Sequence, residues 1–110
     1  MSSLGVRVFY EALRSIDSST FTGVYQALGT PLLHNPFLIK MVNASTVPVT
    51  VSVDGVVDHD ICPAVSFFLY DETSNSSREG GLTVAKGTQF WVKGAAGVGS
   101  VYLVVQYAGG

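Results

Sequence analysis

The chain has 110 residues, which fits a single domain. Hydrophobic residues make up 47% of it and charged residues only 13%, against about 25% in an ordinary soluble domain. A net charge of −2 with scattered Lys and Arg excludes the basic stripe of a nucleic-acid-binding protein. So little charge indicates that neighbouring molecules cover part of the surface, and we expect a homo-oligomer or a larger assembly.

The single cysteine, Cys62, excludes an intrachain disulfide, and we expect its side chain to be buried. No apolar run approaches the roughly 20 residues of a transmembrane helix, so we expect no membrane contact. Residues 1–5 lack the basic and apolar regions of a signal peptide. These features predict a protein that is synthesised in a cytoplasm.

The N-terminal third carries moderate strand signals. Alternation from Val6 predicts a first strand, and residues 11–16 either continue it or form a helical turn. We expect residues 1–20 to form an N-terminal strand and arm that reaches neighbouring subunits. Residues 21–110 then form the β-sandwich core of the same single domain, beginning with a strand at 21–28 that Gly23 weakens.

Strand signals are strongest in the middle of the chain. Residues 48–55 read PVTVSVDG, with alternating β-branched side chains closed by an Asp-Gly turn. Residues 37–42 form an apolar run typical of a buried strand. A short polar loop separates the two runs, which predicts a hairpin.

The remaining segments continue this pattern to the C-terminus. Pro63 precedes an aromatic strand at 65–70, because proline cannot donate to a central ladder. We expect an exposed polar loop at 71–81, a glycine-rich hairpin connection at 94–100, and strands at 82–85, 88–93 and 101–107. The sequence therefore predicts an all-β fold, a single jelly-roll-like β-sandwich of about eight short antiparallel strands.

Asp58, His59 and Asp60 form the one constellation that resembles a metal or catalytic site. On a strand the two carboxylates would face one side and the imidazole the other, so one ion could not easily use all three. We favour a polar loop with hydrogen bonds from Asp to the backbone, and keep a metal-dependent enzyme as an alternative. No nucleophile elbow or phosphate-binding loop is present, so we expect no enzyme activity, catalytic residues, metal or cofactor.

Trp91 is predicted on the more polar face of its strand, with Gln89 and Lys93. There it can anchor an interface, stack on a sugar, or pack under a neighbouring loop. We predict Trp91, Phe9 and Tyr10 as interface residues. The alternative function is a carbohydrate-binding β-sandwich module whose exposed aromatic side chains form a stacking platform: Trp91, Tyr70 and Tyr102.

From Phe37 to Ala108 the sequence contains the segments VSVDGVVDHD, PAVSFFLYDETSN and GLTVAKGTQFWVKGAAGVGSVYLVVQYA. This part of the chain resembles small virion proteins of tailed bacteriophages, of the decoration (cement), head–tail adaptor or tail-associated type. The resemblance implies a non-enzymatic structural subunit in the neck or tail or on the capsid surface. It implies capsid, portal or tail subunits as partners and a location in the virion after synthesis in the host cytoplasm, and the charge pattern predicts no nucleic-acid partner.

Overall fold

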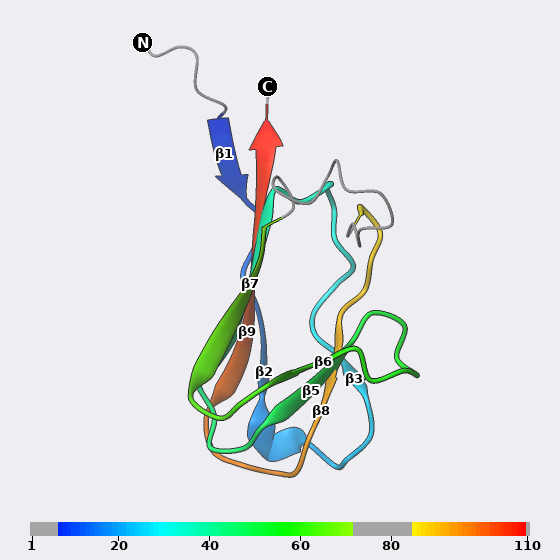
Figure 1. Ribbon diagram of the computed structural model, residues 1–110, viewed down its shortest axis with the longest axis vertical. Helices are drawn as coiled ribbons and strands as arrows, with labels where there is room; N and C mark the ends of the chain where they lie inside the picture. The colour runs from blue at the N-terminus through cyan, green and yellow to red at the C-terminus, as the bar shows by residue number, and fades with distance from the viewer. Residues whose placement is uncertain (1–6, 72–84, 110) are drawn as a thin grey trace.

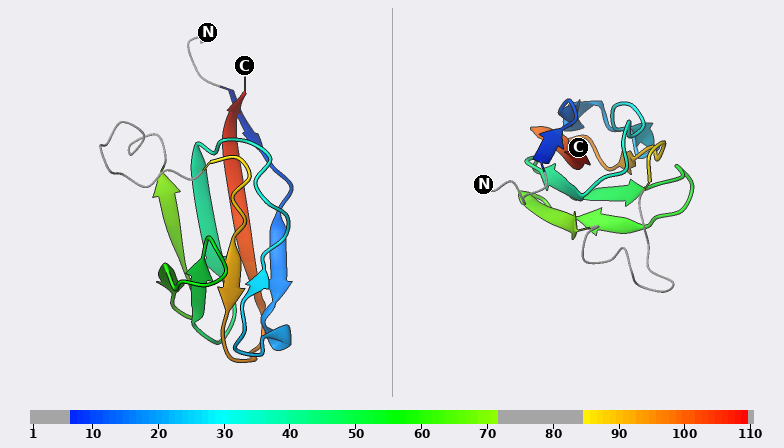
Figure 2. Two further views of the ribbon diagram at one scale, coloured as in Figure 1. Left: turned by 90° about the vertical axis from the view of Figure 1, so that its right-hand side faces the viewer. Right: turned by 90° about the horizontal axis from the view of Figure 1, so that it is seen from above.

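The computed structural model describes residues 7–71 and 85–109. The described residues form nine strands, in two antiparallel sheets that pack face to face (Figures 1 and 2). The predicted all-β sandwich is therefore confirmed. Residues 72–84, which include most of the predicted polar loop and of the predicted strand at 82–85, lie outside the described residues, as does Val6.

The larger sheet has five strands, in the order β1-β9-β4-β7, with β2 also paired to β9. Its strands are β1 (Arg7–Tyr10), β2 (Arg14–Asp17), β4 (Leu38–Asn43), β7 (Ser66–Asp71) and β9 (Ser100–Gly109). Both β1 and β2 run along the ten-residue β9, so the described part of the predicted N-terminal arm is paired within its own chain.

The smaller sheet has four strands, in the order β3-β8-β5-β6. Its strands are β3 (Gln26–Ala27), β8 (Trp91–Lys93), β5 (Val49–Ser52) and β6 (Asp60–Cys62). The predicted strand at 21–28 is thus reduced to two residues. The physical reason is Gly23, whose φ of 86° is outside the strand region and whose N–H bonds to Gly94 O instead.

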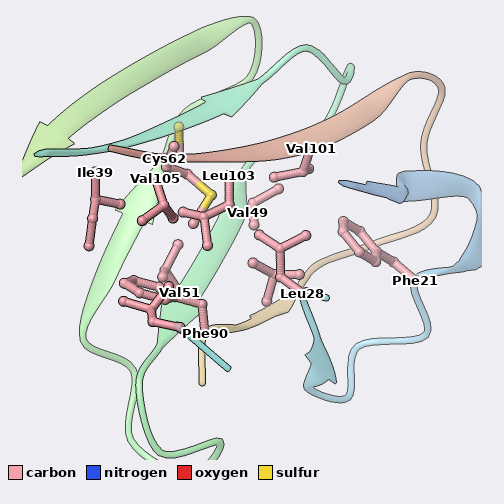
Figure 3. Close-up of a cluster of buried hydrophobic side chains, with 13 residues drawn as sticks. Phe21, Leu28, Ile39, Val49, Val51, Cys62, Phe90, Val101, Leu103 and Val105 are labelled. Atoms are coloured by element: carbon pink, nitrogen blue, oxygen red, sulfur yellow. The ribbon is translucent and has the colours of Figure 1, made fainter. Parts of the chain in front are cut away.

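The core lies between the two sheets, as Figure 3 shows. Alternate residues of each strand point inward, which is why the period-two pattern of the sequence matches the observed burial. Full burial of a Val, Leu, Ile, Phe or Met side chain contributes roughly 1.5–3 kcal/mol. The buried apolar residues are Phe21, Leu28, Leu32, Ile39, Met41, Val49, Val51, Cys62, Phe90, Val92, Val101, Leu103 and Val105.

The predicted hairpin between residues 37–42 and 48–55 is wrong. β4 pairs with β7 and β9 in the larger sheet, whereas β5 pairs with β6 and β8 in the smaller one. The short loop between them is an arch held by Asn43, which is fully buried. Its amide nitrogen donates to the carbonyl oxygens of Val47, Cys62 and Pro63, and its oxygen accepts from the N–H of Ser45.

The glycine-rich segment at 94–99 is also not a hairpin, because it carries the chain from β8 in one sheet to β9 in the other. Gly99 lies against the β4–β5 arch, where an added Cβ would be 2.5 Å from Ala44 O. Gly99 also has a φ of 101°, so the position requires glycine both for its backbone angle and for its contact.

Candidate functional site

The outward side of the larger sheet carries several exposed apolar side chains, among them Phe67, Leu69 and Tyr10. We call it the apolar face. Its position follows from the strand register, because paired residues of antiparallel strands point to the same side. Its described side chains are Val8, Tyr10, Ser15, Asp17, Leu38, Lys40, Val42, Phe67, Leu69, Ser100, Tyr102, Val104 and Gln106.

Two cross-strand rows form the centre of the apolar face. One row joins Phe67, Val42 and Tyr102, and the next joins Leu69, Lys40 and Val104. Phe67 is 60% exposed and Leu69 is 51% exposed, although both are large apolar side chains. Together the two rows place apolar side chains of three neighbouring strands around Lys40, and an exposed apolar surface in a soluble protein marks a contact site.

The predicted interface residues of β1 point to opposite sides. Tyr10 pairs with Gln106 and lies on the apolar face, exposed to 64%, and its hydroxyl accepts a hydrogen bond from the Gln106 amide. Phe9 pairs with Tyr107 and stacks on its ring with centroids 5.7 Å apart. Only Tyr10 therefore adds to the surface of the apolar face.

Trp91 lies in the other sheet, on its outward side beside Ser52. The loop after β5 covers it, since a Cβ on Gly55 would approach the indole ring to 3.1 Å. Tyr102 is on the outward side of the larger sheet, and Tyr70 pairs with Ile39 in that same sheet. The three aromatic residues proposed as a sugar-stacking platform are thus divided between two sheets and do not form one surface.

Asp58 is the centre of a small polar cluster over the outer side of the smaller sheet. Its Oδ1 accepts from the Tyr25 hydroxyl at 2.6 Å and lies 3.0 Å from Lys93 Nζ. These contacts hold the pKa of Asp58 below its usual value. Burial and the hydrogen bond to Asp58 raise the pKa of Tyr25 to about 12.

The neighbouring residues of the predicted constellation have different partners. His59 Nδ1 accepts from the Val53 N–H at 3.2 Å, and Asp60 Oδ1 accepts from the Ile61 N–H at 2.8 Å. No group of three metal-ligating side chains occurs in the described parts of the chain. Asp58, His59 and Asp60 line a shallow open depression with Thr50 and Ile61.

The turn at Asp54, just before Asp58, has hydrogen bonds from an Asp side chain to the backbone, as favoured from the sequence. Asp54 Oδ1 accepts from the backbone N–H groups of Val57 and Val56, at 2.9 and 2.8 Å. These two bonds, with the Ser52 hydroxyl, lower the pKa of Asp54 to about 2. The acidic residues after β5 therefore shape a loop through hydrogen bonds from side chain to backbone.

Glu11 forms a buried polar cluster that the sequence pattern did not reveal. Its side chain is 1% exposed, and Oε1 lies 2.7 Å from Arg14 Nη2. The carboxylate also accepts from the Leu33 N–H and contacts His34 Nδ1 at 2.9 Å. Burial alone would raise the pKa of Glu11, but the bonds from His34, Arg14 and Leu33 outweigh it, and the net pKa is lowered.

Arg14 ties this cluster to the loop that follows β3. Its Nε donates to Thr30 O at 2.8 Å and its Nη2 to Pro31 O at 3.0 Å. Gly29 approaches the same side chain so closely that an added Cβ would be 2.6 Å from Arg14 Cγ. Glu11 and Arg14 are three residues apart, in a segment for which the sequence left both a strand and a helical turn open, so it gave no signal of a buried pair.

His34 completes the cluster at the surface, with its ring stacked on Tyr107 at a centroid distance of 3.6 Å. A carboxylate–imidazole pair can act as a general base when the imidazole also bonds a nucleophile. Within the described chain, the hydrogen bonds of His34 include none to a hydroxyl or thiol. The contacts of the Glu11 cluster join the N-terminal segment, β9 and the loop at 29–35.

No family model, curated protein or solved structure matches this chain. Within the described residues, no helix is long and apolar enough to cross a membrane.

Proposed function

We propose that this protein is a non-enzymatic structural subunit of a phage virion that assembles by protein–protein contacts. The observation that carries the proposal is the apolar face, where Phe67, Leu69 and Tyr10 are exposed around a single described cation, Lys40. Covering such a surface with another protein surface is favourable, because it removes apolar area from water. Its position in the virion is the neck or tail or the capsid surface, as the resemblance to phage virion proteins implies.

The chemistry of the apolar face supports a protein partner over the other classes. A nucleic acid would require several Lys and Arg side chains along its phosphates, and the described side chains of the face include only Lys40. A sugar would require hydrogen-bonding groups beside a flat aromatic platform. The outward residues of β4, β7 and β9 include hydrogen-bonding groups on Lys40, Tyr102 and Gln106, but the large exposed side chains among them, Phe67 and Leu69, offer apolar contact area.

The test is whether the chain is a stoichiometric component of purified particles. Particles from the phage that encodes the chain would be separated on a density gradient, and the chain would be quantified by mass spectrometry against the major capsid protein. A fixed ratio to the capsid protein that persists through repeated gradients is the expected result. Absence from the particles would overturn the proposal.

A matched variant links the particle assay to the apolar face. Phe67→Thr removes an exposed aromatic from the face, whereas Ile61→Thr removes a side chain of similar exposure, 57%, from the other sheet. We expect the first variant to be depleted from particles and the second to be retained. Threonine is β-branched and therefore suits a strand in both variants.

A further inference from the structure

We propose that a second copy of this chain covers the apolar face, with the two larger sheets packed against each other about a two-fold axis. This inference rests on the proposed function, because it names the partner of that same surface. Aligned packing of two sheets is a common way to bury their faces, with side chains from both interdigitating about 10 Å apart. Three separate observations support a second copy.

The first observation is the size of the apolar face. The strands of the larger sheet contain four to ten residues each, and β9 is the longest. With strands about 4.8 Å apart and a rise of about 3.4 Å per residue, this sheet covers about 500 Å². Two such faces together bury about 1,000 Å², which is about the lower limit for a specific protein interface. A second copy covers the whole face, whereas a single added peptide strand covers part of it.

The second observation is the charge on the apolar face. Its described side chains carry one positive charge, on Lys40, and one negative charge, on Asp17. The two residues lie at different positions along the sheet, since Lys40 pairs with Val104 of β9 and Asp17 pairs with Ser100. A two-fold arrangement can therefore direct each Lys40 towards Asp17 of the other copy while the two lysines remain apart. The two charges among these described side chains are opposite in sign, so this part of the face is complementary to itself.

The third observation is Val65, which directly precedes β7 at the edge of the larger sheet. Val65 is the one non-glycine residue with a positive φ among the described residues, at 52°. A β-branched side chain is strained in this region, where Gly or Asn fits better. Val65 is also 78% exposed, so packing within the subunit does not compensate for the strain. A valine at this position is explained by contact with another molecule.

The test is the mass of the purified full-length chain in solution, measured by light scattering and sedimentation over a concentration series. We expect the wild-type protein to form a dimer. The double variant Phe67→Thr/Leu69→Thr should raise the dimer dissociation constant at least tenfold. The matched control Ile61→Thr, on the outer side of the smaller sheet, should leave it unchanged.

Val65→Asn provides a second variant that does not depend on removing large side chains. Asparagine tolerates the left-handed backbone, so the melting temperature of the subunit should stay the same or rise. The dimer dissociation constant should rise in the same variant. A merely structural role for Val65 predicts no change in the dissociation constant.

Three results would overturn the proposal: a wild-type protein that is monomeric at every concentration, a dimer insensitive to the double variant, or a dimer broken by Ile61→Thr. A monomer that is still incorporated into particles, and whose double variant is not, would assign the apolar face to a different virion protein. That outcome overturns the second copy as partner and leaves the proposed function standing. Absence from particles overturns the proposed function itself.

Discussion

Glu11 shows how a buried charge can be held by several partners at once. Removing one member of a buried ion pair leaves the other charge without compensation, at a cost of about 3–5 kcal/mol. Glu11 also accepts hydrogen bonds from Leu33 and contacts His34, so several groups lose a partner when its charge is removed. The local structure of the N-terminal strand and of the loop at 29–35 depends on this one carboxylate.

We therefore predict that Glu11→Gln lowers the free energy of unfolding by about 3 kcal/mol, because Arg14 remains buried without its charged partner. Urea unfolding followed by tryptophan fluorescence measures the change. The matched control is Lys86→Gln, which removes an exposed charge that lies outside the apolar face and outside the Glu11 cluster. The control should change the stability by less than about 0.5 kcal/mol. Equal losses in both variants would contradict the prediction.

The lowered pKa of Glu11 gives a second prediction, on pH dependence. Because the folded-state pKa lies below the unfolded value of about 4.3, the stabilisation is fully present above that value. It is lost as the pH falls through the lowered pKa of the folded state. We expect the stability difference between wild type and Glu11→Gln to be constant from pH 7 to about pH 5 and to shrink below it.

The comparison between the two proteins isolates Glu11 from the other acidic groups. The pKa values of Asp54, Asp58 and Asp17 are also lowered, and these residues are shared by wild type and variant. Their contribution to the acid slope therefore cancels in the difference. Parallel stability curves down to pH 3 would show that Glu11 is not the group responsible.

The arch between β4 and β5 depends on the amide of Asn43 in a similar way. Asn43→Asp changes hardly any volume but replaces the NH₂ donor, so the three carbonyl groups of Val47, Cys62 and Pro63 would face a carboxylate oxygen. We expect this substitution to destabilise the fold by 3 kcal/mol or more, as a rough estimate from the cost of buried unpaired groups. Thermal unfolding followed by circular dichroism measures the loss.

A variant at a nearby exposed position is the control for the arch. Ala44→Ser adds a polar atom to the same loop at an exposed site and should leave the melting temperature almost unchanged. A small effect of Asn43→Asp, comparable to that of the control, would mean that the arch does not depend on the amide.

The sequence predicted which residues face inward better than it predicted which strands pair. Val49 and Val51 are buried as their alternation indicates, because side-chain period depends only on the local strand. Pairing depends on the path of the chain between strands. A five-residue loop fits either a hairpin or an arch, and the difference lies in the hydrogen bonds of Asn43, which only the folded chain brings together.

The surroundings of Trp91, Ile61 and Glu11 were less predictable, because they depend on contacts between residues that are far apart in the sequence. Trp91 was expected on the outer side of its strand and lies there, but no local pattern indicates that Gly55 would cover it. The strand β6 has three residues, of which Ile61 is exposed, so alternation gave no signal. The contact of Glu11 with His34 spans 23 positions, a separation that sequence periodicity does not reach.

The two sheets share one core, so the sandwich should open as a single unit. Residues from both sheets interleave between the layers, and Cys62 from β6 is completely buried among them (Figure 3). Burial also raises the pKa of the Cys62 thiol, which reduces its thiolate fraction and hence its reactivity in the folded state. Cys62 therefore reports opening of the whole core.

We predict that the rate at which a thiol reagent labels Cys62 follows the global stability, even for substitutions in the opposite sheet. Glu11 lies beside β9 in the larger sheet, and Cys62 lies in the smaller sheet. If the sheets separate in one cooperative step, a loss of about 3 kcal/mol in Glu11→Gln should accelerate labelling about a hundredfold. The measurement is labelling under conditions where closing is faster than the chemical reaction.

The same assay connects folding to assembly. A partner that binds only the folded subunit stabilises it by mass action, so labelling of Cys62 should slow as the protein concentration rises. Phe67→Thr/Leu69→Thr should abolish this concentration dependence, because these side chains form the apolar face. If labelling of Glu11→Gln matched the wild-type rate, the sheets would open independently. Cys62 would then report only its own sheet, and the concentration dependence could not be assigned to assembly of the larger one.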